Sequence, residues 1–171
     1  DSFKEEFGAA CWIIENEIGT ERIIGLIDIP GSKKEHDAYR SELGGLYGIV
    51  TAVEILAEIS KLKDGGIEIG GDGMSALNRS FWVDKEDISS KQSHYDMISG
   101  IQGMTAKFRL RFSTRHIKGH QDDIAEVDLD KWALLNIECD LRAKEYWKDI
   151  KVRYRKPPHT MKRGIWQVKI K

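Results

Sequence analysis

The sequence predicts an α/β domain in which helices flank a mixed β-sheet. Two strand-like apolar runs come first in the chain, a long segment with helical spacing follows, and strand and helix patterns then alternate. The 171 residues are enough for one domain with a hydrophobic core and leave little room for a second full domain.

The first predicted element is a β-hairpin. Residues 7–14 (FGAACWII) and residues 22–30 (RIIGLIDIP) are apolar runs with strand character. The polar segment between them, residues 15–21, contains Gly19 and has the composition of a turn.

The strongest helical pattern covers residues 38–63. Its apolar stripe consists of four residues at helical spacing, Leu46, Ile49, Val53 and Leu56. We expect the sequence Asp64-Gly65-Gly66 to end this helix, because glycine readily adopts the left-handed conformation of a C-cap.

Shorter elements follow. The patterns predict a strand over residues 67–71, a helix over 73–81, a polar connection over 82–93, a helix over 96–108 and a strand from 110 towards 117. An acidic loop over 121–130 leads into a predicted helix over 131–150, and residues 166–170 alternate as in a terminal strand.

The formal net charge of −1 conceals an uneven distribution. Residues 142–171 carry 11 Lys/Arg and 2 Asp/Glu, so the remaining residues, 1–141, carry a net charge of −10. This asymmetry indicates a tail that faces a polyanion beside an acidic body that binds metal. A solvated basic extension without a partner is the alternative.

The composition predicts an intracellular protein without a membrane segment. The longest apolar run, residues 9–14, is far shorter than the roughly 20 residues that span a bilayer. Cys11 and Cys139 are the two cysteines of the chain, too few for a disulfide scaffold, which fits a reducing compartment.

Four carboxylates occupy positions that packing alone does not explain. Glu42 heads the apolar stripe of the long helix, and Asp72 follows the strand over 67–71 between two glycines. Asp140 lies within the last helix, and Asp1 precedes the first strand pair. Taken singly, Glu42 is also explained as a solvated residue at the start of the helix, and Asp72 as part of an Asp-Gly turn.

The order of these residues is more specific than any one of them. Five stretches carry it: DSFKEEFGAACWII (1–14), SELGGLYGIVTAVEIL (41–56), IEIGGDGMSAL (67–77), HIKGHQDD (116–123) and LLNIECDLRAK (134–144). Together they resemble the type 1 ribonuclease H family, and their residues are most similar to those of the ribonuclease H domain of retroelement (reverse transcriptase) polyproteins.

The resemblance implies a two-metal site. It makes Asp1, Glu42, Asp72 and Asp140 the carboxylates that bind two Mg²⁺ ions, with Mn²⁺ as a substitute, and His120 the mobile catalytic histidine of the loop before the last helix. Two cations neutralise four carboxylates, activate a water and stabilise the leaving 3′ oxygen. Histidine titrates near neutral pH, which suits a proton shuttle.

The implied substrate is RNA paired to DNA, in a protein that cuts the RNA strand. Such a duplex displays 2′-hydroxyls of one strand in a wide, shallow groove. Residues beside the matched motifs are the candidate contacts: Ser2, Gly44, Gly73, Ser75, Asn78, Arg115 and Lys118. Close packing is the alternative for the helical glycines, and we prefer it for Gly48.

The resemblance also implies a fold. We expect a ribonuclease H-like, three-layer domain over residues 1–150, with a mixed five-stranded sheet, followed by a basic extension over 151–171. In the family the first strand, in the middle of the sheet, ends at the first aspartate, and that strand is missing here because the chain begins at Asp1. A reverse transcriptase domain of the same polyprotein is an implied partner.

Other classes of function make different demands on these residues. Proofreading-type exonucleases place a second acid two residues after the first, where this chain has Phe3, which disfavours them. A zinc module of Cys11, His116, His120 and Cys139 lacks closely paired ligands. A catalytically inactive, retroelement-derived fragment that binds nucleic acid or a protein partner stays open as the alternative.

Overall fold

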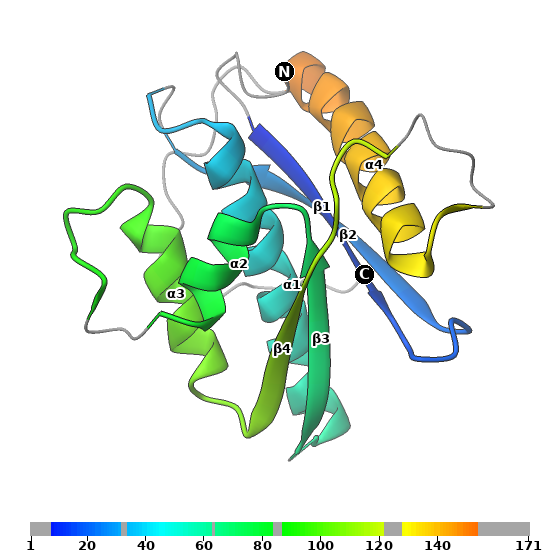
Figure 1. The fold of residues 1–171 in the computed structure, drawn as a ribbon. Helices are drawn as coiled ribbons and strands as arrows, with labels where there is room; N and C mark the ends of the chain where they lie inside the picture. The colour runs from blue at the N-terminus through cyan, green and yellow to red at the C-terminus, as the bar shows by residue number, and fades with distance from the viewer. Residues whose placement is uncertain (1–7, 32–33, 63, 84–86, 122–127, 154–171) are drawn as a thin grey trace.

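The computed structural model describes residues 8–31, 34–62, 64–83, 87–121 and 128–153 (Figure 1). Of residues 151–153 it describes the backbone alone. The predicted order of elements over residues 8–153 is confirmed. The elements are β1 (Gly8–Glu15), β2 (Arg22–Ile29), α1 (Ala38–Ser60), β3 (Gly65–Gly71), α2 (Met74–Phe81), α3 (Tyr95–Thr105), β4 (Leu110–His116) and α4 (Lys131–Arg153).

The described strands form two separate pairs. β1 and β2 are antiparallel, from Gly8 opposite Ile29 to Glu15 opposite Arg22. β3 and β4 are parallel, with Gly71 opposite His116 at their carboxyl ends. The predicted α/β class with strands of both senses is confirmed, whereas the described residues show two two-stranded sheets and not one sheet of five.

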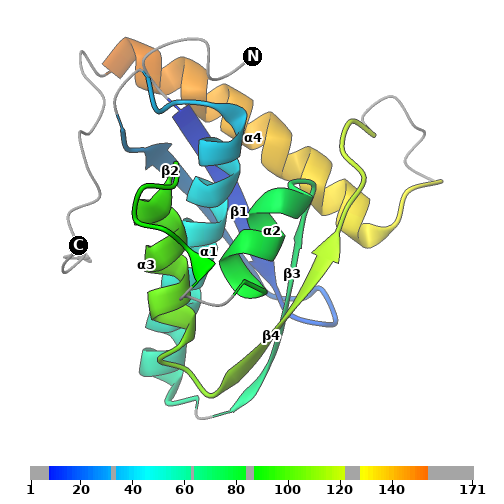
Figure 2. The same ribbon diagram turned by 60° about the vertical axis from the view of Figure 1, so that its left-hand side comes forward.

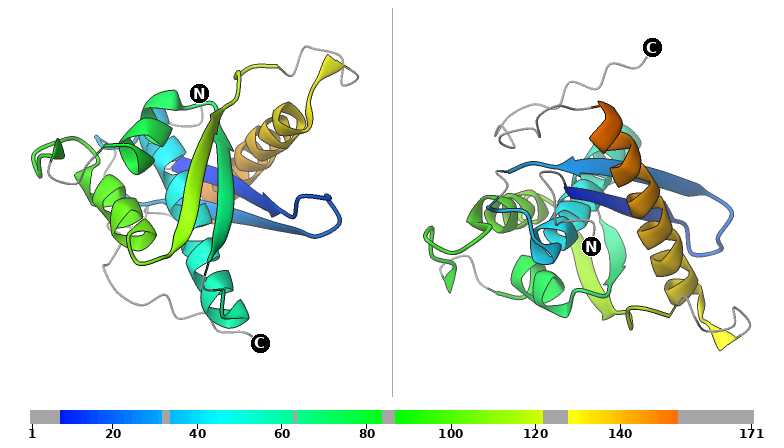
Figure 3. Two further views of the ribbon diagram at one scale, coloured as in Figure 1. Left: turned by 60° about the horizontal axis from the view of Figure 1, so that its bottom comes forward. Right: turned by 90° about the horizontal axis from the view of Figure 1, so that it is seen from above.

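Helices cover both faces of the β1–β2 hairpin, with α1 on one side and α4 on the other (Figure 3). The alternation of side chains along β1 explains this arrangement. Ala10 faces α1, because a Cβ added to Gly45 of α1 would lie 3.6 Å from the Cβ of Ala10. Ala9, one residue earlier, packs in the opposite direction against Ile150 of α4.

The main core lies where α1, α2 and α3 meet the β3–β4 pair. Leu43, Val50, Ile69, Ile98 and Ile101 are almost fully buried there. The predicted apolar stripe of α1 is confirmed in part: Leu46 and Val53 are buried, whereas Ile49 and Leu56 are only half-buried. Figure 2 shows that a short turn joins the carboxyl end of β3 to α2. Because α2 is part of this core, the core fixes the carboxyl end of β3.

The predicted end of α1 is wrong. The helix ends at Ser60, and its left-handed cap is Lys61 (φ 54°), not one of the later glycines. The backbone N–H of Leu62 donates to the Ala57 carbonyl (2.9 Å), and this bond offsets the roughly 1–2 kcal/mol that the left-handed conformation costs lysine. Gly65, with φ 145°, instead opens β3.

α1 is long and apolar enough to cross a membrane by length and composition alone, the one such helix in the described part of the chain. Core helices of soluble proteins meet the same criterion. Here α1 contacts β1, β2, α2 and α3. The predicted absence of a membrane segment and the intracellular location therefore stay predictions.

The last helix crosses the predicted domain boundary. α4 continues through residue 150 to Arg153 without a break. The rest of the predicted basic extension, including the alternating residues 166–170, lies outside the described residues. The division at residue 150 stays a prediction.

A buried arginine anchors the start of α1. Asp37 caps the helix by accepting from the Arg40 backbone N–H (2.7 Å). The Arg40 side chain is only 2 % exposed; it pairs with Asp96 of α3 (2.9 Å) and donates to the Pro30 carbonyl (2.7 Å). This network holds the first turns of α1, which include Glu42, against α3 and the end of β2.

Stability is expected to fall as the pH drops below about 6.5, because of His36. His36 is 8 % exposed, and its Nε2 lies 3.1 Å from the Gly31 carbonyl, which can only accept. Burial lowers the pKa of His36, and its Nδ1 has no hydrogen-bond partner among the described residues. The unfolded chain therefore takes up the proton first.

Replacing His36 with glutamine is expected to flatten the fall of the unfolding free energy between about pH 7 and pH 5. Urea titrations of both proteins at several pH values measure this slope. An unchanged slope in His36→Gln would assign the pH dependence to other groups.

Candidate functional site

The carboxyl ends of β3 and β4 lie side by side because the two strands are parallel. The Ile117 N–H donates to the Gly71 carbonyl (2.9 Å), and the His116 Nε2 lies 3.1 Å from the Asp72 carbonyl. The Asp72 side chain is exposed at this edge. Edges of this kind, where strands end, are where α/β folds bind ligands.

Glu42 reaches the same edge from α1. A Cβ on Gly73 would collide with the Glu42 carboxylate, so the glycine makes room for that side chain. Burial raises the pKa of Glu42, and repulsion from Asp72 and Asp37 raises it further. The structure thus brings together two of the four predicted metal-binding carboxylates, although they lie thirty residues apart in the chain.

The loop after β4 brings the residue before the predicted histidine against Asp72. A Cβ on Gly119 would lie 3.2 Å from Asp72 Oδ2, so Gly119 packs against that carboxylate. His120 follows it, exposed, with a left-handed backbone (φ 53°). Histidine is one of the residue types enriched in this conformation, which clusters at functional sites.

Asp140 has a different partner. Its carboxylate is largely exposed on α4 and pairs with Lys144 one turn later (2.7 Å). Among the residues that the structure describes, no cluster of three His, Cys, Asp or Glu side chains could hold a metal ion. Asp1, the fourth predicted ligand, lies outside the described residues.

The predicted nucleic-acid contacts divide into exposed and buried residues. Gly73, the N-cap of α2, is half-buried, and Ser75 and Asn78 of α2 are exposed. Gly44 is buried, and a Cβ there would collide with Ile29, which fits the close-packing alternative for this glycine. Gly48 packs against the Trp12 ring, as we preferred. Ser2 lies outside the described residues.

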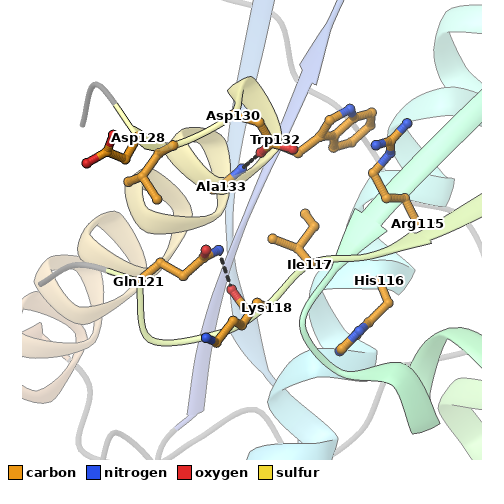
Figure 4. A pocket seen from close by; sticks show the side chains of 10 residues that line it. Arg115, His116, Ile117, Lys118, Gln121, Asp128, Asp130, Trp132 and Ala133 are labelled. Carbon is orange, nitrogen blue, oxygen red and sulfur yellow. Dashed lines mark hydrogen bonds between the residues drawn. The ribbon is translucent and has the colours of Figure 1, made fainter. Parts of the chain in front are cut away.

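Arg115 and Lys118 line an open pocket of about 340 Å³ beside the site (Figure 4). The Arg115 guanidinium lies 5.3 Å from the centre of the Trp132 ring and pairs with Glu68 (3.0 Å). Trp132 also covers Gly70 of β3, where a Cβ would collide with the ring. Sequence reasoning missed Trp132, whose signal is its place in the first turn of α4, after the capping Asp130.

Tyr39 is a second residue that sequence reasoning missed. It precedes Glu42 by three residues on α1, and its hydroxyl forms a hydrogen bond with the Ser75 side chain of α2. Burial raises the pKa of Tyr39. Helical spacing from Glu42 is the signal that could have indicated it, because residues three apart share a helix face.

Replacing Glu42 with glutamine is expected to stabilise the metal-free chain. The change removes a half-buried charge and its repulsion from Asp72, and the gain is up to about 1 kcal/mol because solvent screens the pair. Thermal unfolding in a chelator measures it. Glu58→Gln, at an exposed position near the end of the same helix, is the matched control and should change little. Equal shifts in both variants would contradict repulsion at the site.

Comparison with known proteins adds no relative to these observations. No family model matches the sequence, and no curated protein matches it.

Proposed function

We propose that this protein is a metal-dependent endonuclease that hydrolyses the RNA strand of RNA–DNA hybrids. The observation that carries the proposal is the meeting of Glu42 and Asp72 across Gly73 at the carboxyl end of β3. The His120 loop adjoins the same edge through Gly119. These residues come in the chain order that the resemblance requires.

The paired carboxylates fit a divalent cation. The charge of Asp72 raises the pKa of Glu42, and a positive charge between the two carboxylates would relieve this repulsion; hard cations such as Mg²⁺ prefer oxygen ligands. Asp1, Glu42, Asp72 and Asp140 would hold two ions. When bound, the ions supply activation of the attacking water and stabilisation of the charge on the leaving oxygen.

The Asp140–Lys144 ion pair has to open for this role. Both side chains are about half exposed, so the pair contributes at most about 1 kcal/mol and a divalent cation can compete for Asp140. Cations held by Glu42 and Asp72 would offset the repulsion that a third carboxylate meets there. We therefore expect metal binding to recruit Asp140.

A fifth strand between β1 and β3 would join the two sheets. Among the described strands β1 pairs only with β2 and β3 only with β4, and α4 contacts strands of both pairs. A strand that ends at Asp1 and brings Asp1 to Asp72 runs parallel to β3, because Asp72 follows the end of β3. Such a strand, covered by helices on both faces, has to be apolar on both faces.

The surface around the site suits a nucleic-acid backbone. The exposed Ser75 and Asn78 continue from Gly73 along α2 and offer short polar groups to 2′-hydroxyls. Arg115 and Lys118, exposed on the other side of Asp72 beyond β4, offer positive charge to phosphates. Contacts of the second kind weaken steeply as salt rises.

A cleavage assay with matched duplexes tests the proposal. The chain, alone and with an apolar strand segment added before Asp1, is incubated with an RNA–DNA hybrid, double-stranded RNA, double-stranded DNA and single-stranded RNA of one sequence. We expect Mg²⁺-dependent cleavage of the RNA in the hybrid alone. An intact hybrid in both Mg²⁺ and Mn²⁺, with a folded extended chain, would overturn the proposed activity.

One observation favours the non-enzymatic alternative, a domain that binds nucleic acid or a protein partner without cutting. Asp140 pairs with Lys144, and no described contact links it to Glu42 or Asp72. Retained binding of the hybrid by the folded extended chain, without cleavage in either metal, is the outcome that this alternative predicts.

A further inference from the structure

The two cysteines of the chain face each other across the interface between β1 and α4. Cys11 follows Ala9 by two residues, so both side chains lie on the face of β1 that α4 covers. Cys139, Tyr146 and Ile150 recur at helical spacing on α4. Ile150 packs on Ala9, and the Tyr146 hydroxyl donates to Asp28 of β2 (2.6 Å).

The packing of Ile150 on Ala9 at one end and the Arg22–Glu138 ion pair at the other place the two thiols opposite each other. The interaction with the Cys139 side chain lowers the pKa of Cys11. The contacts of the surrounding interface fix this juxtaposition, because Lys131 of α4 pairs with Glu15 at the far end of β1. The interface around the two cysteines is therefore held by the packing of Ile150 on Ala9 at one end and by the Lys131–Glu15 ion pair at the other.

Charged side chains surround Cys11. Glu138, next to Cys139, pairs with Arg22 of β2 (2.6 Å) and with Arg142 (2.8 Å). These two guanidinium groups favour the thiolate of Cys11, whereas burial and Glu138 oppose it. Both cysteines are only partly buried.

We propose that Cys11 and Cys139 form an oxidisable pair that glutathione disulfide, or another small disulfide, converts to a disulfide bond between β1 and α4. The Cys11 thiolate attacks the small disulfide and releases one glutathione, leaving a mixed disulfide. The Cys139 sulfur, after losing its proton to solvent, attacks the Cys11 sulfur and releases the second glutathione. Two protein thiols are oxidised and one disulfide is reduced.

The crosslink joins strand and helix segments from opposite ends of the described chain. It fixes the helix residue that precedes Asp140, so oxidation would tie the position of that carboxylate to the hairpin. In a reducing environment the pair stays as two thiols, and it closes when the proportion of small disulfides rises. This inference does not depend on the proposed nuclease activity.

Intact-mass analysis of the full chain after treatment with glutathione disulfide tests the proposal. We expect loss of two hydrogen atoms, a linked Cys11–Cys139 peptide after proteolysis, and a melting temperature higher by about 5–10 °C that a reductant reverses. Cys139→Ser should stop at a mixed disulfide on Cys11, one glutathione heavier. Cys11→Ser should form no intramolecular disulfide.

The opposite outcomes are equally clear. Disulfide-linked dimers, a separate glutathione on each cysteine, or a chain that stays fully reduced would overturn the proposal. Because the mass and the linked peptide are measured on the unaltered chain, they decide the question even if a serine variant fails to fold.

Discussion

Replacing Asp72 with asparagine is expected to reduce cleavage of the RNA strand by at least about 10³-fold with little loss of stability. Asparagine keeps the shape of the side chain but removes the charge that holds a cation at the end of β3, and a loss of several kcal/mol in transition-state stabilisation corresponds to such a factor. Because Asp72 is exposed, the unfolding free energy should change by less than about 0.5 kcal/mol.

Asp64→Asn is the matched control for this variant. Asp64 is also exposed and lies next to the opposite end of β3, so it shares the strand and the residue type but not the site. Single-turnover cleavage and circular dichroism of both variants separate activity from folding. Equal activity of Asp72→Asn and Asp64→Asn would remove Asp72 from the catalytic site.

Replacing Gly48 with valine is expected to destabilise the protein by about 3 kcal/mol or to prevent folding. A Cβ at this position would lie 2.6 Å from Nε1 and 2.7 Å from Cδ1 of the Trp12 ring. The Trp12 ring also lies against Gly25 of β2, where a Cβ would collide with it. The backbone of β2 therefore opposes movement of the ring away from α1. Two glycines thus hold one tryptophan between the hairpin and α1.

Gly45→Ala, one turn earlier on α1, tests the same helix without the collision. A Cβ there would meet Ala10 and the Cys11 carbonyl at an ordinary 3.6 Å. Alanine should therefore stabilise the helix by about 0.5–1 kcal/mol. Urea unfolding compares the two variants, and destabilisation of similar size in both would show that α1 tolerates no added Cβ, independently of Trp12.

The elements could be predicted because their signals are local. Continuous apolar runs define the strands of the hairpin, and the stripe through Leu46 and Val53 defines α1. The end of α1 could not be predicted in the same way. Its cap depends on a backbone bond from Leu62 to Ala57, which lets Lys61 take the conformation that glycine was expected to supply.

The candidate site was only partly predictable. The resemblance predicted that Glu42 and Asp72 belong to one site, whereas the space that Gly73 leaves for the glutamate follows only from the structure. The ion pair of Asp140 with Lys144 was not predicted, because acidic and basic residues four apart are common on helix surfaces. Trp132 was missed because its contacts with Gly70 and Arg115 join distant parts of the chain.

The position of bound Mn²⁺ tests the central claim most directly, namely that Glu42 and Asp72 hold the metal that cuts RNA. Crystals of the chain, grown with Mn²⁺ and an RNA–DNA hybrid, give this position by anomalous diffraction. The account predicts an Mn²⁺ ion within about 2.5 Å of carboxylate oxygens of both Glu42 and Asp72, with Asp140 released from Lys144. Mn²⁺ bound elsewhere, with these two carboxylates free of metal, would contradict it.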